Sequence, residues 1–427
     1  MRGQILSHAQ PLQPKSINAT AAASDMIAES NRVWAKTAYP LTRARGMHYF
    51  TPEGRPMLDG TSGDWHTGAG HCRAPIVSAI RDTAARFDSA PAGEAGDVQI
   101  ELLSQRLAML MPPPLEHVVF AGTGITALTR ALKIAAACHP SHSTLQNGHI
   151  ILREGSDKRF SLTQVSLKTA ECPMNPMSGG TFTYAQTAEE IEDLIALCGA
   201  RSIIALVIDP LGVAAGLSIG TPEYLQQIRA ITKRHGIFLI FDERHSAFGR
   251  LGTPTAAERF GVQPDLIVVA ESLTNKTLPL GAILCSTAIS RKLVPQYASE
   301  LAAELRWRPD PVATAAALAT LDLYEEEELF VRAAELEPYW QDSVRALCGA
   351  PKVADIRGLG LTAAIELETR PGQPGKRGAE LFQCCFEYGA VTRVIGDTLI
   401  LSPPLIISED QIDEIVEKLS AALRKVT

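Results

Sequence analysis

The sequence lacks several features that would place it in a special class of protein. No apolar run approaches the roughly 18–20 residues that span a bilayer, so we expect no membrane-spanning segment. The eight cysteines form no CxxC pair and none sits at metal-binding spacing from a histidine, so we expect neither a metal site nor a disulfide framework. A net charge of −7 argues against nucleic acid or an anionic membrane as the main partner.

The remaining composition is that of an ordinary globular protein. The chain has 427 residues, 46% of them hydrophobic and 20% charged, which is enough for one large and one smaller domain. Its first twenty residues contain no apolar core of signal-peptide length, and scattered cysteines are typical of small buried side chains in a reducing compartment. We therefore expect a cytoplasmic protein.

Apolar patterns along the chain predict an α/β fold. The runs SIIALVIDP and GIFLIFDE are almost continuously apolar and end in acids, as strands covered on both faces of a parallel sheet do. The shorter runs DLIVVA and LGAILCS are similar, and helical patterns such as 222–235 lie between them. We predict an N-terminal arm and part of a small domain over 1–75, a large doubly wound, mostly parallel sheet domain over 76–310, and a C-terminal small α/β domain over 311–427.

Three motifs in order carry a resemblance to a known family. They are LDGTSGDWHTGAGH (58–71), the series FDE, FGR, LTN and LPLGA (241–282), and RVIGDTLILSPPLII (393–407). Together they resemble the class III aminotransferases, in particular the ω-amino acid:pyruvate branch, over roughly residues 40–425. The resemblance implies fold type I, the fold of one large group of enzymes that use pyridoxal phosphate (PLP), with a small domain built from both ends of the chain.

PLP chemistry needs a lysine that forms an imine with the coenzyme, an acid beside the pyridine nitrogen, and donors at a helix N-terminus for the phosphate. Asp242 matches the family acid and ends an apolar strand, where ligand-facing groups of parallel sheets lie. It could equally cap the turn that follows. At the lysine position, the LTN and LPLGA blocks fix the register without gaps, and Glu271 stands there.

A carboxylate cannot form an imine. Lys276, five residues later, falls on a family glycine in the turn. Lys276 could be a solvated turn residue, a ligand contact, or a substitute for the missing amine.

Other coenzyme contacts implied by the resemblance have changed as well. The phosphate-binding segment is Thr123-Gly124-Ile125-Thr126, in which Thr123 and Gly124 could still donate hydrogen bonds. Asp157, Lys158 and Arg159 stand where the family has its aromatic stacking motif. Arg306 replaces the threonine that reaches the phosphate of a partner subunit. Because several contacts change together, a single Lys→Glu inactivation of an ordinary enzyme is disfavoured.

Several positions that match the family's binding residues, or lie next to them, hold basic side chains. Arg393 matches the family arginine that clamps the substrate carboxylate, and Trp65 matches an aromatic residue at the substrate entrance. If further basic residues faced the same centre, they would form an anion-binding cleft; the candidates are Arg244, Lys158, Arg159, Lys276 and Arg306. Arginines and lysines are also common on solvated surfaces, and Arg393 could belong to a structural ion pair.

Three functions follow from these residues. The first is a repurposed aminotransferase fold without covalently bound PLP, which binds an anionic small molecule and uses Glu271, Asp242 and the nearby His245 as acid or base. The second is an enzyme that still uses PLP or pyridoxamine phosphate (PMP), either non-covalently or through Lys276. The third is a non-catalytic binding subunit. A homodimer is expected in each case, from the resemblance.

Overall fold

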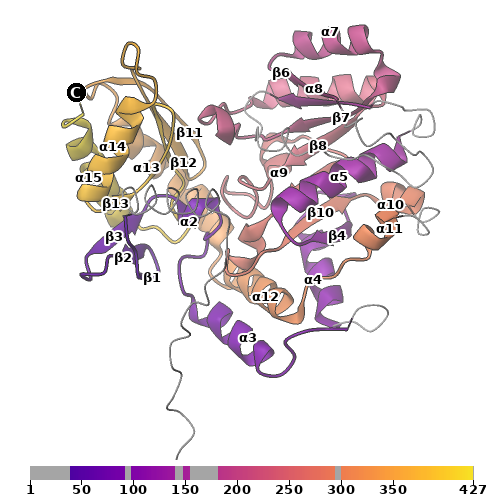
Figure 1. Cartoon of the computed structure of the whole chain (residues 1–427), viewed down its shortest axis with the longest axis horizontal. Helices are drawn as coiled ribbons and strands as arrows, with labels where there is room; N and C mark the ends of the chain where they lie inside the picture. Colours follow the sequence, from indigo (N-terminus) through magenta and orange to yellow (C-terminus); the bar gives the residue numbers. More distant parts are fainter. Residues whose placement is uncertain (1–38, 92–97, 140–147, 154–180, 294–299, 427) are drawn as a thin grey trace, which may run out of the picture.

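The computed structural model describes residues 39–91, 98–139, 148–153, 181–293 and 300–426. Figure 1 shows a larger α/β unit and a smaller one that contains the C-terminus, with α2 (Ser62–Trp65) between them. No helix in these ranges is long and apolar enough to cross a membrane. They contain no cluster of three or more His, Cys, Asp or Glu side chains arranged to hold a metal ion.

The larger unit is built on a seven-stranded sheet. Its strand order is β4-β10-β9-β8-β7-β5-β6, and every neighbouring pair is parallel except those that β10 makes with β4 and β9. The strands are β4 (His117–Ala121), β5 (His149–Arg153), β6 (Thr181–Ala185), β7 (Ile203–Ile208), β8 (Phe238–Asp242), β9 (Leu266–Val269) and β10 (Gly281–Cys285). The predicted doubly wound, mostly parallel sheet is confirmed.

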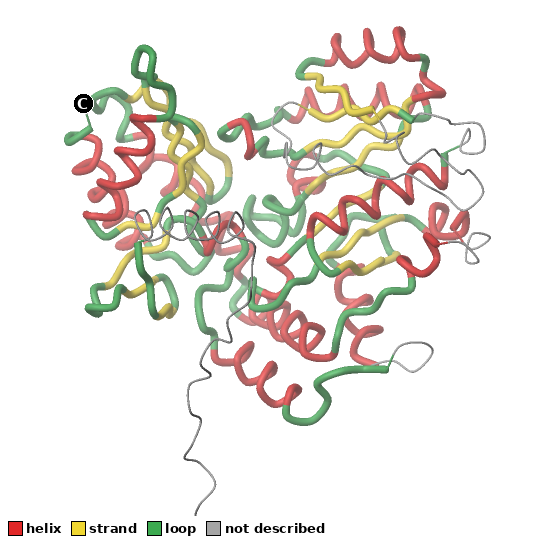
Figure 2. Tube along the Cα trace, in the orientation of Figure 1, coloured by secondary structure: helices red, strands yellow, loops and turns green. Residues whose placement is uncertain are grey.

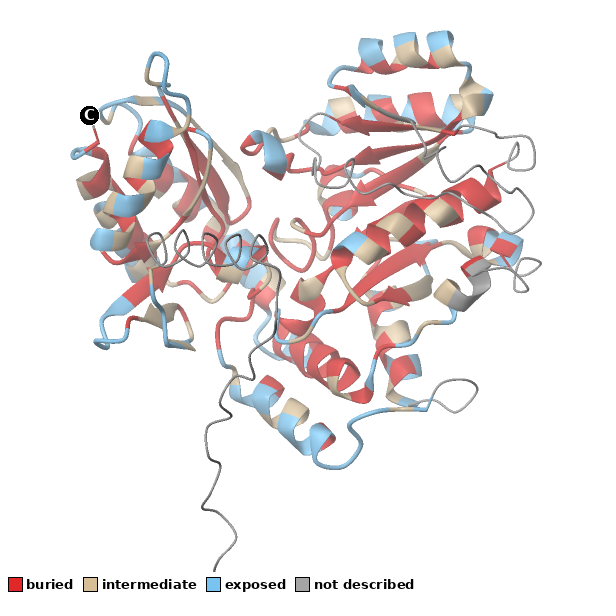
Figure 3. Ribbon diagram, viewed as in Figure 1, coloured by how far each residue is buried: buried red, intermediate tan, exposed pale blue. Residues whose placement is uncertain are grey.

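Helices cover both faces of this sheet, as Figure 2 shows. Along each strand, alternate side chains enter opposite cores: Ile267 and Val269 pack on one face, and Leu266 and Val268 pack on the other with α5. The helices of this unit are α3 (Ala74–Ala84), α4 (Val98–Met109), α5 (Gly124–Cys138), α7 (Ala188–Cys198), α8 (Pro222–His235), α9 (Ala256–Phe260), α10 (Thr287–Leu293) and α11 (Glu300–Leu305). The central strands β7, β9 and β10 are buried at every position (Figure 3).

Helix α8 shows how closely local sequence sets an element. Thr221 caps it by accepting from the N–H of Tyr224, Pro222 occupies its first position, and Gly236 ends it in the left-handed conformation. The predicted range 222–235 is confirmed.

Two smaller sheets complete the chain. One joins the N- and C-terminal parts because β13 (Ala390–Val391) pairs with β3; its other strands are β1 (Arg43–Arg45), β2 (His48–Phe50) and β3 (Pro56–Asp59). The other is antiparallel and comprises β11 (Val353–Leu359), β12 (Thr362–Leu367), β14 (Arg393–Ile395) and β15 (Thr398–Leu401). The helices in this part are α12 (Pro311–Glu326), α13 (Leu329–Arg345), α14 (Lys376–Glu387) and α15 (Glu409–Leu423). The predicted domain boundaries at residues 75 and 310 stay a prediction.

Candidate functional site

Both oxygens of the acid at the end of β8 accept hydrogen bonds from the arginine two residues later. Arg244 donates from Nε to Oδ1 of Asp242 and from Nη2 to Oδ2, both at 2.7 Å. The two side chains are 7% and 3% exposed, so this is a buried bidentate ion pair. Arg244 also packs against the start of α5, because a Cβ built on Gly124 would lie 2.7 Å from Arg244 Cδ. The arginine therefore fills the space between Asp242 and the N-terminus of α5.

A second carboxylate lies at the same helix terminus. Glu271 begins the 3-10 turn η3 (Glu271–Thr274) directly after β9, and its Oε1 accepts from the backbone N–H of Gly124 at 3.2 Å. Thr123 caps α5, since its Oγ1 accepts from the N–H of Thr126 at 3.1 Å. The positive end of the helix dipole stabilises negative charge at this point. The predicted donors Thr123 and Gly124 thus lie beside Glu271, and Gly124 is already bonded to it.

His66 is a central residue that the sequence analysis missed. Its Nδ1 lies 3.0 Å from Ser272 Oγ, and its Nε2 lies 4.0 Å from Glu271 Oε2. Burial, reinforced by the nearby His245 ring and by the positive charge of Lys276, holds the pKa of His66 well below its ordinary value. The ring is therefore neutral near neutral pH, and its approach to Glu271 is not an ion pair. The available signal was its position next to Trp65 inside the first family motif.

An aromatic cluster continues from His66 toward the sheet. The ring of His245 stacks on His66 at a centroid distance of 6.0 Å and lies 5.3 Å from the ring of Trp65. Trp65 is 3% exposed, so it is a buried wall of this centre. His245 Nδ1 is 3.6 Å from Asp209 Oδ2, too long for a hydrogen bond, and has no other partner among the described residues.

Asp209 is the buried carboxylate next to His245. Burial would raise its pKa, but His245 and the backbone N–H groups of Val213 and Leu211 lower it below its ordinary value. Asp209 therefore carries its negative charge inside the protein, next to the ring of His245. The predicted acid–base candidates Asp242, His245 and Glu271 all lie in this region of the structure.

Two further predicted cations, Arg393 and Lys276, meet another carboxylate, that of Asp64. Asp64 Oδ1 accepts from Nη1 of Arg393, and its Oδ2 lies 3.8 Å from Nζ of Lys276. Lys276 also donates to the backbone carbonyl of Gly63. Each of Arg244, Lys276 and Arg393 thus faces an acid, which offsets much of the positive charge that the sequence predicted for this centre.

The backbone that presents Asp64 is unusual. Ser62, Gly63, Asp64 and Trp65 all have positive φ, with values of 48°, 55°, 68° and 81°. Glycine is required at position 63, where a Cβ would lie 2.3 Å from Thr67 Oγ1. A tryptophan at positive φ is rare, and such backbone strain is concentrated at functional sites.

Hydrogen bonds hold the two segments of the centre together. The Asn275 side chain accepts from the N–H of Ala69 at 3.0 Å and donates to the carbonyl of Gly70 at 2.8 Å. Tyr324 on α12 donates to the carbonyl of Ser272 at 3.0 Å. The 66–70 and 271–276 segments are therefore one connected frame.

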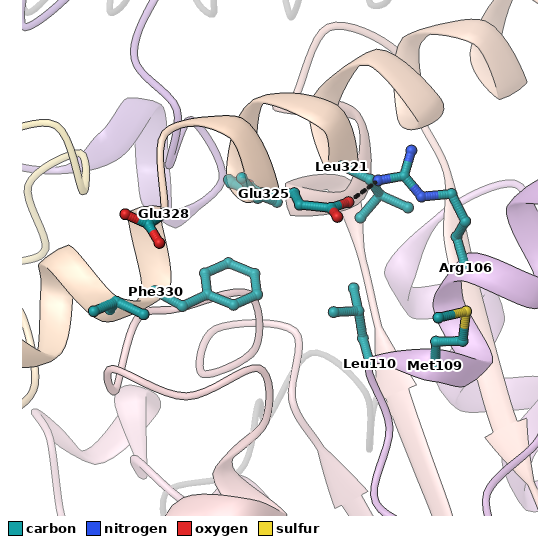
Figure 4. Close-up of a pocket in the computed structure, with 9 residues that line it drawn as sticks. Arg106, Met109, Leu110, Leu321, Glu325, Glu328 and Phe330 are labelled. Carbon is teal, nitrogen blue, oxygen red and sulfur yellow. Dashed lines mark hydrogen bonds and ion pairs between the residues drawn. The ribbon is translucent and has the colours of Figure 1, made fainter.

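A hollow of about 380 Å³, lined in part by Tyr324, lies next to α12 (Figure 4). Arg106 lines it from α4, Leu110 from the turn directly after α4, and Phe330 from α13. Arg106 pairs with Glu325 across its rim. None of the predicted site residues lines this hollow.

Other predicted residues lie elsewhere. Arg306 is exposed between α11 and α12. Asp157, Lys158 and Arg159 fall outside the described residues.

Comparisons with known proteins agree with this architecture. The family model described as Aminotransferase class-III matches residues 30–423. An omega-aminotransferase of Caulobacter vibrioides is 39% identical over 93% of this chain and 96% of its own length. A beta-alanine–pyruvate aminotransferase of Pseudomonas aeruginosa is 32% identical over 93% of this chain and 94% of its own.

Solved structures match over nearly the whole chain. An (S)-enantioselective omega-transaminase from Thermomicrobium roseum superposes with a TM-score of 0.79 at 27% identity, covering 96% of this chain and all of its own. The omega transaminase of Pseudomonas jessenii in complex with PMP superposes with a TM-score of 0.81, covering 92% of this chain and 94% of its own; at 23% identity it shows the fold alone.

Proposed function

Because the chain belongs to the class III aminotransferase family, we propose that it is a member in which imine-based transamination has been replaced. In its place, the protein binds and transforms a carboxylate-bearing small molecule without a covalent PLP–lysine link. The observation that carries this proposal is the buried bidentate pair between Arg244 and Asp242.

The pair bears directly on whether PLP fits. A pyridine ring would have to reach Asp242 through the space that the Arg244 side chain fills, since its guanidinium contacts both carboxylate oxygens at 2.7 Å and its Cδ packs against Gly124. The N–H of Gly124, which would serve a phosphate, donates to Glu271 instead. As these side chains stand they do not fit PLP, and we derive no step through it.

Glu271 supports the loss of the imine independently. It stands in the register of the family lysine and offers an oxygen instead of an amine. Lys276 does not replace that amine in this arrangement, because its Nζ is directed to Gly63 and Asp64.

The chemistry we assign to the centre is proton transfer on a bound carboxylate compound. Glu271 is the base, held at the N-terminus of α5, and the neutral ring of His66 lies 4.0 Å from it with one nitrogen on Ser272. Arg393 and Lys276 supply positive charge for the carboxylate. Proton transfer is a step shared by elimination, isomerisation and condensation, which all stay open.

To test whether any lysine forms an imine with PLP, the full-length protein is incubated with PLP and then reduced with borohydride. When free PLP is removed before the reduction, we expect no stoichiometric pyridoxyl adduct at any single lysine by peptide mass mapping, and no amino-group exchange between an amine and pyruvate. Lys276→Ala is the matched variant, because an adduct present in the wild type and absent from this variant would establish a PLP enzyme that uses Lys276. Retention of unreduced PLP or PMP through gel filtration would establish non-covalent use.

A non-catalytic binding subunit is favoured by one observation, the mutual pairing of charges. Asp242 pairs with Arg244, and Asp64 lies against both Arg393 and Lys276, so each of these three cations already faces a carboxylate without a ligand. Native mass spectrometry of the purified protein separates the two functions. A ligand that is bound and slowly changed supports an enzyme, and one that is bound and never changed supports a binding subunit.

We also propose a cytoplasmic homodimer. The described cysteines are all free thiols, which is typical of a reducing compartment. Two apolar side chains on α4, Val98 and Met109, are 85% and 84% exposed, which fits a face covered by a second copy. Sedimentation analysis tests this, with Met109→Glu expected to shift the protein toward monomer.

A further inference from the structure

We propose that Asp64 is a built-in occupant of a two-cation carboxylate site formed by Arg393 and Lys276, and that a carboxylate substrate binds by displacing it. The inference rests on the proposed function above, because both concern the same carboxylate-binding centre. It adds Lys276 as a second cation and Asp64 as the group that competes for both.

The contacts of Asp64 are those that an external carboxylate would make. One of its oxygens accepts from Arg393, and the other lies 3.8 Å from the ammonium of Lys276. Arg393 comes from β14 and Lys276 from the turn after η3, so the carboxylate joins two separate parts of the chain. A substrate carboxylate has the same charge and the same two oxygens, so it competes for the same donors.

The exposure of the three side chains to solvent distinguishes this contact from a buried structural ion pair. The side chain of Asp64 is 58% exposed, and those of Arg393 and Lys276 are 34% and 40% exposed. Exposed ion pairs contribute little to stability because water solvates the separated charges well. Asp64 can therefore leave its partners without leaving a buried charge behind.

The backbone on both sides of the contact is strained. Asp64 and Trp65 have φ values of 68° and 81°, and Lys276 has a φ of 60°. Residues held in this region are concentrated at ligand clamps and switch regions, where the surrounding structure maintains the strain. Trp65 is anchored in the core, so the carboxylate of Asp64 is placed by a backbone that is fixed immediately after it.

Displacement also has a consequence at the neighbouring acid–base residues. His66 lies 3.0 Å from Ser272 Oγ and 4.0 Å from Glu271, both in the η3 turn that leads directly to Lys276. A substrate carboxylate seated between Arg393 and Lys276 is thereby brought to the side of the centre that holds the proposed base. The two-cation site orients the substrate, and Glu271 acts on it.

The experiment measures binding of propionate, a simple carboxylate, to the full-chain protein by isothermal titration calorimetry. Asp64→Asn keeps the size of the side chain and removes its charge. We expect propionate to bind this variant about fivefold more tightly than the wild type, which corresponds to losing a competing surface interaction of about 1 kcal/mol. Neutral propionamide should show no such gain.

Matched variants separate this effect from a change in net charge. Glu192→Gln removes the same charge from an exposed pair with Arg234 far along the chain, and should bind propionate as the wild type does. Arg393→Gln should abolish binding. Labelling of Arg393 by phenylglyoxal, followed by peptide mass mapping, should be faster in Asp64→Asn than in the wild type.

The outcomes distinguish this inference from the proposed function. Equal propionate affinity in the wild type and Asp64→Asn, with loss in Arg393→Gln, overturns the role of Asp64 and leaves the carboxylate site standing. No propionate binding by the wild type, Asp64→Asn or Glu192→Gln overturns both. Tighter binding and faster labelling in Asp64→Asn alone support the displacement of Asp64.

Discussion

Two aspartate–arginine pairs of this protein lie in the same region and have opposite physical characters. Asp242 and Arg244 are almost completely buried and share two hydrogen bonds of 2.7 Å. Asp64 and Arg393 are 58% and 34% exposed, and a second cation stands beside them. Because the cost of separating charges depends on whether water replaces the partner, the first pair is a fixed part of the interior and the second is exchangeable.

The largest expected effect comes from breaking the buried pair. Asp242→Ala leaves the guanidinium of Arg244 buried without its counter-charge, which should reduce the free energy of unfolding by about 3–5 kcal/mol. Urea denaturation of both proteins measures this. The double variant Asp242→Leu/Arg244→Met should recover most of the loss, since an apolar pair replaces both charges together. A loss below about 1 kcal/mol would show that the pair is not buried as described.

Glu243, the next residue, is a buried carboxyl that accepts from the N–H groups of Ala256 and Ala257 and has no arginine. Burial raises its pKa from 4.5 to about 7. The folded protein therefore holds a proton that the unfolded chain releases near pH 4.5, so this group's contribution to stability is complete below that pH. The contribution declines as the pH rises through about 7.

The expected size of that decline is roughly 3 kcal/mol across this range. Glu243→Gln mimics the protonated form and should lack this pH dependence. Urea denaturation of both proteins at pH 5 and pH 8 gives the difference. Parallel pH profiles for the two proteins would contradict the raised pKa.

An intermediate loss of stability is expected when a hydrogen bond between the 66–70 and 271–276 segments is removed. Asn275→Ala removes the amide that bonds Ala69 and Gly70, and leaves a buried N–H and a buried carbonyl unpaired. We expect a loss of about 2 kcal/mol in unfolding free energy. Gln105→Ala, which breaks an exposed amide contact to Glu101 on α4, is the matched control and should change stability little.

The smallest effect is expected for the exposed pair itself. Asp64→Asn should change the free energy of unfolding by less than about 1 kcal/mol, since surface ion pairs contribute little. Thermal unfolding at low and high salt checks this. A loss as large as that of Asp242→Ala would remove the contrast between the two pairs.

The difference between buried and exposed positions also affects how clearly a strand can be recognised in the sequence. The strand Ile203–Ile208 is buried at every position, so its sequence is continuously apolar and easily recognised. Strand β11 (Val353–Leu359) has exposed and half-buried residues, and its sequence alone gave no clear signal. Burial is not the whole reason, because β5 and β12 are mostly buried and were also missed, as was β6.

Within the site, the residues at the ends of strands could be predicted from the sequence. The hydrogen bonds and ion pairs between residues far apart in the sequence could not. Asp242 and the position of Glu271 follow from strand ends and motif register. The contact between Asp64 and Arg393 joins residues 329 positions apart, and no local pattern encodes it. His66 lay inside a recognised motif, yet its role depends on Ser272 and Glu271, which only the folded chain brings to it.

The glycine at position 63 limits how this loop can evolve. A β-carbon there would lie 2.3 Å from Thr67 Oγ1, so a larger residue at position 63 requires the loop to shift. A glycine in the same place in a related chain therefore reports the path of the backbone. It carries no information on whether that relative has kept a lysine, or gained an acid, at the position of Glu271.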